Sequence, residues 1–385
     1  MKKMTAILIV SMMMILMSCG KKEAGEKVVA DKDGVKNFVN KSTPTDPTAT
    51  LELKKLFTIS GENEGDSLAS FNRPLSLTSD KDGNIYILDI NSMSLKKFDK
   101  DGKFVTSIGR RGQGPGELFH PSFVMLLEDT LMIMSQGQKK VSRFTTEGDF
   151  IDDKRMEMDV QLPKTYDNKN IISYTVIFNQ NETEPKIKFS LSLLDKNLKV
   201  TNAFEKRDID IQEFVQGKVS ISDLLIPFTP GENKVFLSEN DDNQYKVNVY
   251  DMDGNKTYTV KKQYKRIKYT TEEHEAFKAY MEKEGRGMND GSMKLDNFKK
   301  AFGAMYYDKY GRLLIVPEVD RKIDKEGAYI DIFKDGIYLN RVDFEINKGL
   351  VNLGAFTFMQ KQLFFIGERL YVLDLAEITV DVYDY

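Results

Sequence analysis

The feature that most constrains the fold is a series of short β-type segments separated by aspartate-rich turns. Between residues 74 and 109, short segments rich in β-branched and aromatic residues are separated by turns, and in Lys103–Gly109 apolar and polar side chains alternate. Alternation with a period of two is typical of half-buried strands, and Asp-x-Asp-Gly sequences are typical of hairpins. We therefore predict four consecutive strands, the content of one propeller blade. The segments are Pro74–Thr78, Ile85–Asp89, Leu95–Asp99 and Lys103–Gly109, with turns at Asp80–Asn84 and Asp99–Gly102.

A glycine-rich stretch follows these strands. It resembles the link between blades of NHL-type propellers in Ile108-Gly109, Gly112, Gly114 to Leu118 and Pro121. The segment from Asp80 to Asp89 resembles the aspartate, turn and strand of the same repeat. A fainter copy of the link, Ile59–Gly61 through Asn72–Pro74, lies about one blade earlier. Together with the leader described below, the repeat resembles the six-bladed propeller lipoproteins common in Bacteroidetes, which implies an all-β, six-bladed β-propeller.

Later segments continue the pattern of short strands and turns, so we predict that residues 51–385 form one propeller of six blades. The remaining strands are expected at 130–133 and 141–144; 171–178, 186–194 and 198–204; 234–238, 246–250 and 256–260; 312–316, 329–333 and 337–344; and 362–366, 369–373 and 379–383. Leu53–Ser60 precedes the first blade. We expect it to complete the last blade, so that the two ends of the domain meet and no sheet edge is left open.

One stretch, about residues 270–305, predicts a small helical insertion. Thr270 and Glu273 have the spacing of a capping box, and apolar residues recur at helical intervals before Gly285 and Gly287. A second helix is predicted from Leu295, Phe298, Phe302 and Met305 at intervals of three, four and three. Packing onto the propeller is the favoured role, and a lid over one face is the alternative.

The first residues indicate export and lipidation. Lys2 and Lys3 precede an apolar run that is too short to remain as a membrane span, which predicts a signal peptide over residues 1–18. The run ends in Leu16-Met17-Ser18-Cys19-Gly20, which resembles the bacterial lipobox. Cys19 is the only cysteine of the chain, so no disulfide can form within it. We predict that Cys19 is lipidated and becomes the mature N-terminus.

Residues 19–50 are expected to be the lipidated cysteine followed by a flexible tether, because they combine many charges and turn formers with few apolar side chains. Removal of the signal peptide takes two of the 56 basic residues, so 54 face 59 acidic ones and the net charge is −5. Both signs are spread along the chain, and no basic patch predicts nucleic-acid binding. After residue 19 no apolar stretch has the length of a membrane span, which leaves the lipid as the expected anchor.

Candidate catalytic residues are scarce. His120 and His274 are the only histidines, which excludes a zinc site of three histidines. No Gly-x-Ser-x-Gly motif occurs, and the Gly109–Gly116 loop lacks the Gly-x-x-x-x-Gly-Lys pattern of a phosphate loop. We assign no catalytic, cofactor-binding or metal-binding residue. Acidic turns offer oxygen ligands for Ca²⁺ but have the composition of ordinary hairpins: Asp80–Asp82, Asp99–Asp101, Asp241-Asp242 and Asp251–Asp253.

Two functions fit these observations. The leading hypothesis is a monomeric, lipid-anchored binding module without enzymatic activity, which presents a propeller face to a protein, peptide or glycan. The alternative is a metal-dependent lyase or lactonase with its site at the central channel, where carboxylates hold Ca²⁺. Because no aspartate follows Cys19 directly, the resemblance to enterobacterial sorting signals implies the outer membrane. The sequence does not choose between its periplasmic and outer faces.

Overall fold

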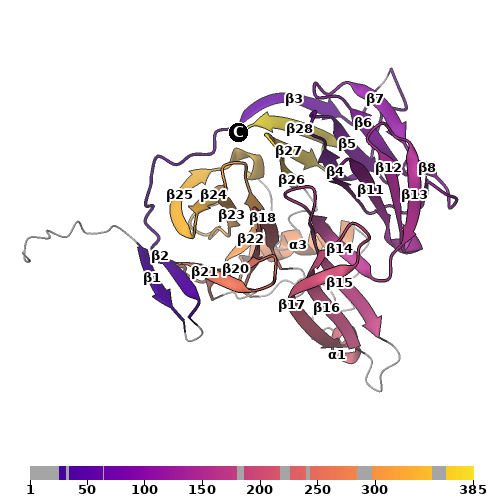
Figure 1. Cartoon of the computed structure of the whole chain (residues 1–385). Coiled ribbons are helices and arrows are strands. Elements are labelled where there is room, and N and C mark those ends of the chain that lie inside the picture. The colour runs from indigo at the N-terminus through magenta and orange to yellow at the C-terminus, as the bar shows by residue number, and fades with distance from the viewer. Residues whose placement is uncertain are drawn as a thin grey trace, which may run out of the picture.

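The computed structural model describes residues 26–31, 34–63, 65–179, 186–216, 226–239, 243–283, 297–348 and 361–385. Over these residues six sheets are arranged as a ring (Figure 1), which confirms the predicted all-β, six-bladed β-propeller. The helical elements are α1 (Ile211–Val215), α3 (Thr271–Lys283) and the short 3₁₀ turns η1 (Gln136–Gln138) and η3 (Glu345–Asn347). None of the described helices combines the length and the apolar character that a membrane crossing requires.

Each blade is a meander whose first strand lies nearest the centre of the ring. Blade 1 contains β4 (Pro74–Ser79), β5 (Ile85–Asp89), β6 (Ser94–Phe98) and β7 (Phe104–Ile108). Blade 2 contains β10 (Phe123–Leu127), β11 (Thr130–Ser135), β12 (Lys140–Thr145) and β13 (Phe150–Arg155). Blade 3 contains β14 (Asp159–Lys164), β15 (Ile171–Asn179), β16 (Lys186–Leu194) and β17 (Val200–Asp210).

The second half of the ring repeats this plan. Blade 4 contains β18 (Phe228–Gly231), β19 (Lys234–Ser238), β20 (Tyr245–Asp251) and β21 (Lys256–Lys262). Blade 5 contains β22 (Phe302–Tyr307), β23 (Leu313–Pro317), β24 (Tyr329–Lys334) and β25 (Ile337–Asp343). Blade 6 contains β26 (Lys361–Ile366), β27 (Arg369–Asp374), β28 (Thr379–Asp384) and β3 (Lys54–Ser60). A small parallel pair, β8 (Arg110–Arg111) and β9 (Glu117–Leu118), lies in the link between blades 1 and 2.

Blade 6 closes the ring with strands from both ends of the domain. β3 pairs antiparallel with β28, with Ser60 opposite Thr379 and Lys54 opposite Asp384. This confirms the predicted role of residues 53–60. Because β3 occupies the outer position of this blade, the last strand of the chain is not left with an open edge.

The hydrophobic core is divided into six clusters, one between each pair of neighbouring blades. Inward and outward side chains alternate along each strand, so both faces of a blade contribute to a core. In blade 1, for example, Ile87 packs toward blade 6 while Leu88 packs toward blade 2, and neither is exposed. Each blade is therefore held by its two neighbours.

The predicted tether is wrong from residue 26 onward. Residues 26–40 form a hairpin of β1 (Glu26–Ala30) and β2 (Lys36–Asn40), and β2 pairs in parallel with β21 so that the sheet of blade 4 has six strands. The physical reason is a small apolar contact. Phe38 packs edge-on against Tyr258 at 5.3 Å between ring centroids and lies over Gly336, where a Cβ would come within 2.6 Å of its ring.

Residues 41–50 also lie on the propeller. Backbone N–H groups of Thr45 and Asp46 donate to Tyr338 O and Leu339 O of β25, and Asn340 donates to Pro47 O and Ala49 O. The propeller with its added strands therefore begins at residue 26 rather than 51. The signal peptide, Cys19 and residues 20–25 lie outside the described residues.

The helical insertion is partly confirmed. Thr270 and Glu273 form the predicted capping box at the start of α3, with Glu273 N to Thr270 Oγ1 at 3.2 Å and Thr270 N to Glu273 Oε2 at 2.9 Å. The second helix is wrong over residues 298–305: Phe298 makes an isolated bridge to Lys268, and Phe302 begins β22. A bulge after Phe302 shifts the alternation, so Phe302 and Met305 are both buried at a helix-like interval. Leu295 lies outside the described residues.

Candidate functional site

The residues considered from the sequence do not assemble into a catalytic site. His120 and His274 are both exposed, and each ring packs against a neighbouring aromatic ring, of Phe119 and Tyr269 respectively. Within the described residues, no three His, Cys, Asp or Glu side chains are grouped as metal ligands. Cys19 and the Asp241-Asp242 turn lie outside these residues.

The glycine-rich link and the acidic turns have structural roles. Glu117 folds back into the Gly109–Gly116 loop, where its Oε2 accepts from Gly114 N at 3.0 Å and its Oε1 pairs with Arg110. The loop is thus occupied by the chain's own carboxylate. In the first turn, Asp80 Oδ1 accepts from Asn84 N, and its Oδ2 accepts from Tyr86 OH at 2.8 Å.

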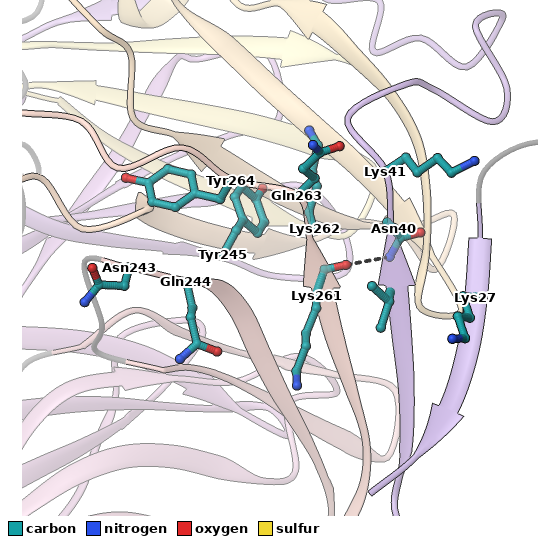
Figure 2. A pocket seen from close by; sticks show the side chains of 11 residues that line it. Lys27, Asn40, Lys41, Asn243, Gln244, Tyr245, Lys261, Lys262, Gln263 and Tyr264 are labelled. Carbon is teal, nitrogen blue, oxygen red and sulfur yellow. Dashed lines mark hydrogen bonds between the residues drawn. The ribbon is translucent and has the colours of Figure 1, made fainter.

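The structure reveals a pocket that the sequence did not predict, at the seam where the N-terminal hairpin joins blade 4. Its volume is about 730 Å³. Figure 2 shows Asn243 and Gln244 on one side, Lys27 and Lys41 on the other, and Lys261 between them. We call this cavity the seam pocket. It is lined by Lys27, Val39, Asn40, Lys41, Asn243, Gln244, Tyr245, Lys261, Lys262, Gln263 and Tyr264.

Strand pairing places three lysines on one row across this sheet. Lys246 of β20 lies opposite Lys261 of β21, which lies opposite Val39 of β2, which lies opposite Lys27 of β1. Strands are spaced about 4.8 Å apart, so Lys261 and Lys27 are separated by about 10 Å. Lys246 forms an ion pair with Glu239 at 2.9 Å. No described carboxylate pairs with Lys27, Lys41 or Lys261.

A buried ionic network lies next to the pocket, on the face of β21 opposite Lys261, and contains the lining residue Lys262. Asp331 of β24, whose side chain is fully buried, accepts from Arg341 Nε at 2.7 Å and Tyr245 OH at 2.9 Å, and its Oδ2 lies 3.0 Å from Lys262 Nζ. Burial favours the neutral acid, but Arg341 and Lys262 outweigh it and lower the pKa of Asp331. Burial lowers the pKa of Lys262 to about 8, against the opposing charge of Asp331. Two cations facing one carboxylate leave this network with a net positive charge.

Asn40 holds the hairpin that forms one wall. Its Nδ2 donates to Lys261 O at 3.0 Å and to Gly336 O at 2.9 Å, and its Oδ1 accepts from Tyr338 N at 2.8 Å. One side chain thereby connects β2 to β21 and to the turn before β25. These partners belong to blades 4 and 5, more than 200 residues away along the chain.

The chemistry of the lining favours polar ligands. Lysine ammonium groups donate only, whereas the side-chain amides of Asn243, Gln244 and Gln263 each carry donors and an acceptor. Tyr264 adds an aromatic ring and a hydroxyl. The sequence signal for this site was present in Lys27-Val28-Val29 and Phe38-Val39, two short β-type segments inside an otherwise polar stretch.

A further lysine lies among the inner strands at the centre of the ring. Lys164 of β14 donates to Phe228 O of β18 at 2.7 Å, and its ammonium lies 4.9 Å from the Phe228 ring centroid and 6.0 Å from that of Tyr306. Burial lowers the pKa of Lys164 to about 8. No described carboxylate pairs with it. This lysine connects blades 3, 4 and 5 rather than serving the seam pocket.

Comparison with known proteins supports the fold. Residues 73–225 match the DUF5128 family model, described as a 6-bladed beta-propeller. A putative exported protein from Bacteroides fragilis NCTC 9343 is similar over 90% of this chain and 98% of its own, with 12% identity and a TM-score of 0.51. No curated protein matches.

Two further solved structures align at lower similarity. A member of the DUF4221 family from Bacteroides vulgatus ATCC 8482 aligns over 94% of this chain and 98% of its own, with 10% identity and a TM-score of 0.46. A catalytically inactive virginiamycin B lyase from Staphylococcus aureus, with quinupristin, aligns over 87% and 99%, with 10% identity and a TM-score of 0.43. The six-bladed propeller is supported by the family model, and the Bacteroides fragilis structure is similar to this fold.

Proposed function

We propose that this chain is a lipid-anchored propeller of the cell envelope that binds a protein, peptide or glycan in the seam pocket. The observation that carries the proposal is the pocket itself. It is large enough for a small ligand, and charged, amide and aromatic residues of the N-terminal hairpin and of blade 4 line it. A binding role needs no catalytic residues. It uses blade 4, whose sheet has six strands where the other blades have four.

The proposed anchor lies close to this pocket along the chain. Lys27, in the pocket wall, follows Cys19 by eight residues, and eight residues span at most about 29 Å whatever their conformation. A domain of this size has a radius of gyration of about 20 Å. A lipid on Cys19 would therefore keep the edge of blade 4 near the membrane, and the ligand would be met there.

The anchor is tested on the full chain expressed in a bacterium. Mass spectrometry of the mature N-terminal peptide should find a lipid on Cys19 and no residue before it, and Cys19→Ala should release the protein from membranes. An unmodified Cys19 in the membrane fraction would contradict the anchor.

Orientation is tested with single cysteine labels, because a lipidated Cys19 has no free thiol. Lys36→Cys, on the exposed part of β2, and Lys81→Cys, in the first turn of blade 1, carry the same fluorophore. In proteoliposomes with a headgroup quencher, the label at residue 36 should be quenched more strongly. Equal quenching would contradict a blade 4 edge close to the membrane.

Ligand binding is tested by thermal shift of the detergent-solubilised mature protein against oligosaccharides and peptides. A ligand at about 100 times its Kd should stabilise the protein by about 2.7 kcal/mol. Val39→Trp fills the pocket and should abolish the shift. Val105→Trp is the matched control, since Val105 is also an exposed valine, on the outer strand of blade 1. Binding that survives Val39→Trp would place the ligand elsewhere. A shift with Ca²⁺ alone, removed by a chelator, would favour the lyase or lactonase alternative.

A further inference from the structure

The seam pocket carries positive charge that does not stabilise the fold. Lys27, Lys41 and Lys261 line it without a described carboxylate partner, whereas Lys246, on the same row, forms an ion pair with Glu239. Like charges directly opposite each other destabilise a sheet, and Lys246 and Lys261 are such a pair. A bound anion would therefore reduce the repulsion between these lysines.

A buried network next to the pocket also carries a net positive charge. The network of Lys262, Arg341 and Asp331 contains two cations and one carboxylate, and Lys262 is nearly inaccessible to water. Counterions in solvent screen such a buried group less than they screen an exposed lysine. An anionic group in the pocket therefore meets the lysines of the wall, and the net charge of the neighbouring network has the same sign.

The remaining lining indicates what carries the anion. Amide side chains, from Asn243, Gln244 and Gln263, match the mixed donors and acceptors of hydroxyl groups. Among the eleven lining residues, Val39 has the only aliphatic side chain, and Tyr245 and Tyr264 have aromatic rings that carry hydroxyl groups. Peptide recognition commonly uses apolar side-chain pockets or an added strand, so this lining suits a sugar better.

We infer that the seam pocket selects an acidic oligosaccharide, with carboxylate, sulfate or phosphate groups bound by Lys27, Lys41 and Lys261 and hydroxyl groups bound by the amides. This inference rests on the proposed binding function and names its ligand class. Charge-assisted hydrogen bonds from lysine to an oxyanion supply the selectivity. Tyr264, half-buried in the lining, adds an aromatic ring.

The test compares acidic oligosaccharides with neutral counterparts of the same backbone. Oligogalacturonate is paired with its methyl ester, and a sulfated and a phosphorylated oligosaccharide are each paired with the unsubstituted sugar. Binding to the mature protein in detergent is measured by calorimetry at 50 and 500 mM salt. At least one acidic member should bind at least tenfold more tightly than its neutral partner, and high salt should weaken it.

Variants then assign the effect to the pocket. The triple variant Lys27→Gln, Lys41→Gln, Lys261→Gln should weaken acidic binding about tenfold, if each lysine contributes about 0.5 kcal/mol. The matched control, Lys81→Gln, Lys100→Gln, Lys103→Gln, removes the same charge from exposed turns of blade 1 and should bind normally. Equal weakening in both would show a general charge effect and overturn the inference.

The two proposals fail in different ways. Neutral sugars binding as tightly as acidic ones, with Val39→Trp blocking both, would overturn the anionic selectivity and leave the binding module standing. Tight binding of an acidic peptide, with no acidic sugar bound, would also overturn the sugar class alone. If no sugar, peptide or protein binds, the binding function and the inference both fail.

Discussion

Blades 1 and 4 are built from the same four-stranded meander, but they differ at the outermost strand. In blade 1 the outer strand β7 is the last strand, and its turns are satisfied by their own aspartates. In blade 4 the outer strand β21 accepts a fifth and a sixth strand from the N-terminus. They lie on opposite sides of the ring (Figure 1). The difference teaches that the repeat supplies stability, whereas the added hairpin supplies the pocket.

The largest effect should come from the core of blade 1. Ile87 is fully buried against blade 6, so Ile87→Ala leaves a cavity and should lower the free energy of unfolding by about 3 kcal/mol. Denaturant titration of the full chain in detergent measures it, and Ile87→Val, expected to cost about 1 kcal/mol, is the control. A cost below 1 kcal/mol for the alanine variant would mean that the blades do not support one another as a continuous ring.

The next effect should be local to the hairpin of blade 4. Asn40→Ala removes three hydrogen bonds and leaves Tyr338 N–H and Gly336 O without these partners, at a cost of about 2 to 3 kcal/mol. Hydrogen exchange should show roughly 100-fold faster exchange across residues 26–40 and little change in blade 1. Asn37→Ala, which loses one bond to Val35 O, is the milder control. Loss of protection around the whole ring would contradict a separable hairpin.

These two regions also differ in how far the sequence predicts them. Blade 1 is readable because its signals are local: Asp80 bonds Asn84 and Gly83 takes a positive φ of 82°, all within five residues. Most strands of the six blades follow from the same local signals, but β10, β13, β14, β18 and β22 were not predicted, and β17 continues to Asp210, beyond the predicted end at residue 204. Closure by β3 was predictable because one strand lacked a blade.

The seam pocket was not predictable because its signals are long-range. Asn40 makes its bonds with residues 221, 296 and 298 positions away, and composition over residues 20–50 hides two five-residue strands among charged neighbours. The bulge in β22 caused the second error, since it gave strand residues a helical interval. Both failures occur where tertiary contacts override the local pattern.

The inner edge of blade 4 provides a test by pH. Lys164, which donates to Phe228 O of β18, has a pKa of about 8 in the folded protein against about 10.5 unfolded. Between these values the unfolded chain holds a proton that the folded protein has released. The free energy of unfolding should therefore rise with pH from about 8 to 10, by up to about 1.4 kcal/mol per unit.

Lys164→Met isolates this contribution. Denaturant titrations at pH 7, 8, 9 and 10 should give a smaller rise in the variant than in the wild type, since methionine has no proton to release. Lys81→Met, at an exposed turn of blade 1, should leave the slope unchanged. Identical slopes in wild type and Lys164→Met would contradict a buried ammonium at the centre of the ring.

The smallest effect contrasts the two blades most sharply, because a Lys→Gln substitution should stabilise the protein in blade 4 and destabilise it in blade 1. In blade 4, Lys261→Gln removes repulsion with Lys246 across the strand pair and should stabilise the protein by a few tenths of a kcal/mol at low salt. In blade 1, Lys97 donates to Thr146 O at 2.8 Å and lies over the Tyr86 ring, so Lys97→Gln should destabilise by about 1 kcal/mol. High salt should remove the gain at Lys261, because it screens the repulsion. A loss of stability in Lys261→Gln would mean that this lysine serves the fold, as Lys97 does, and its place in the pocket would then need no ligand to explain it.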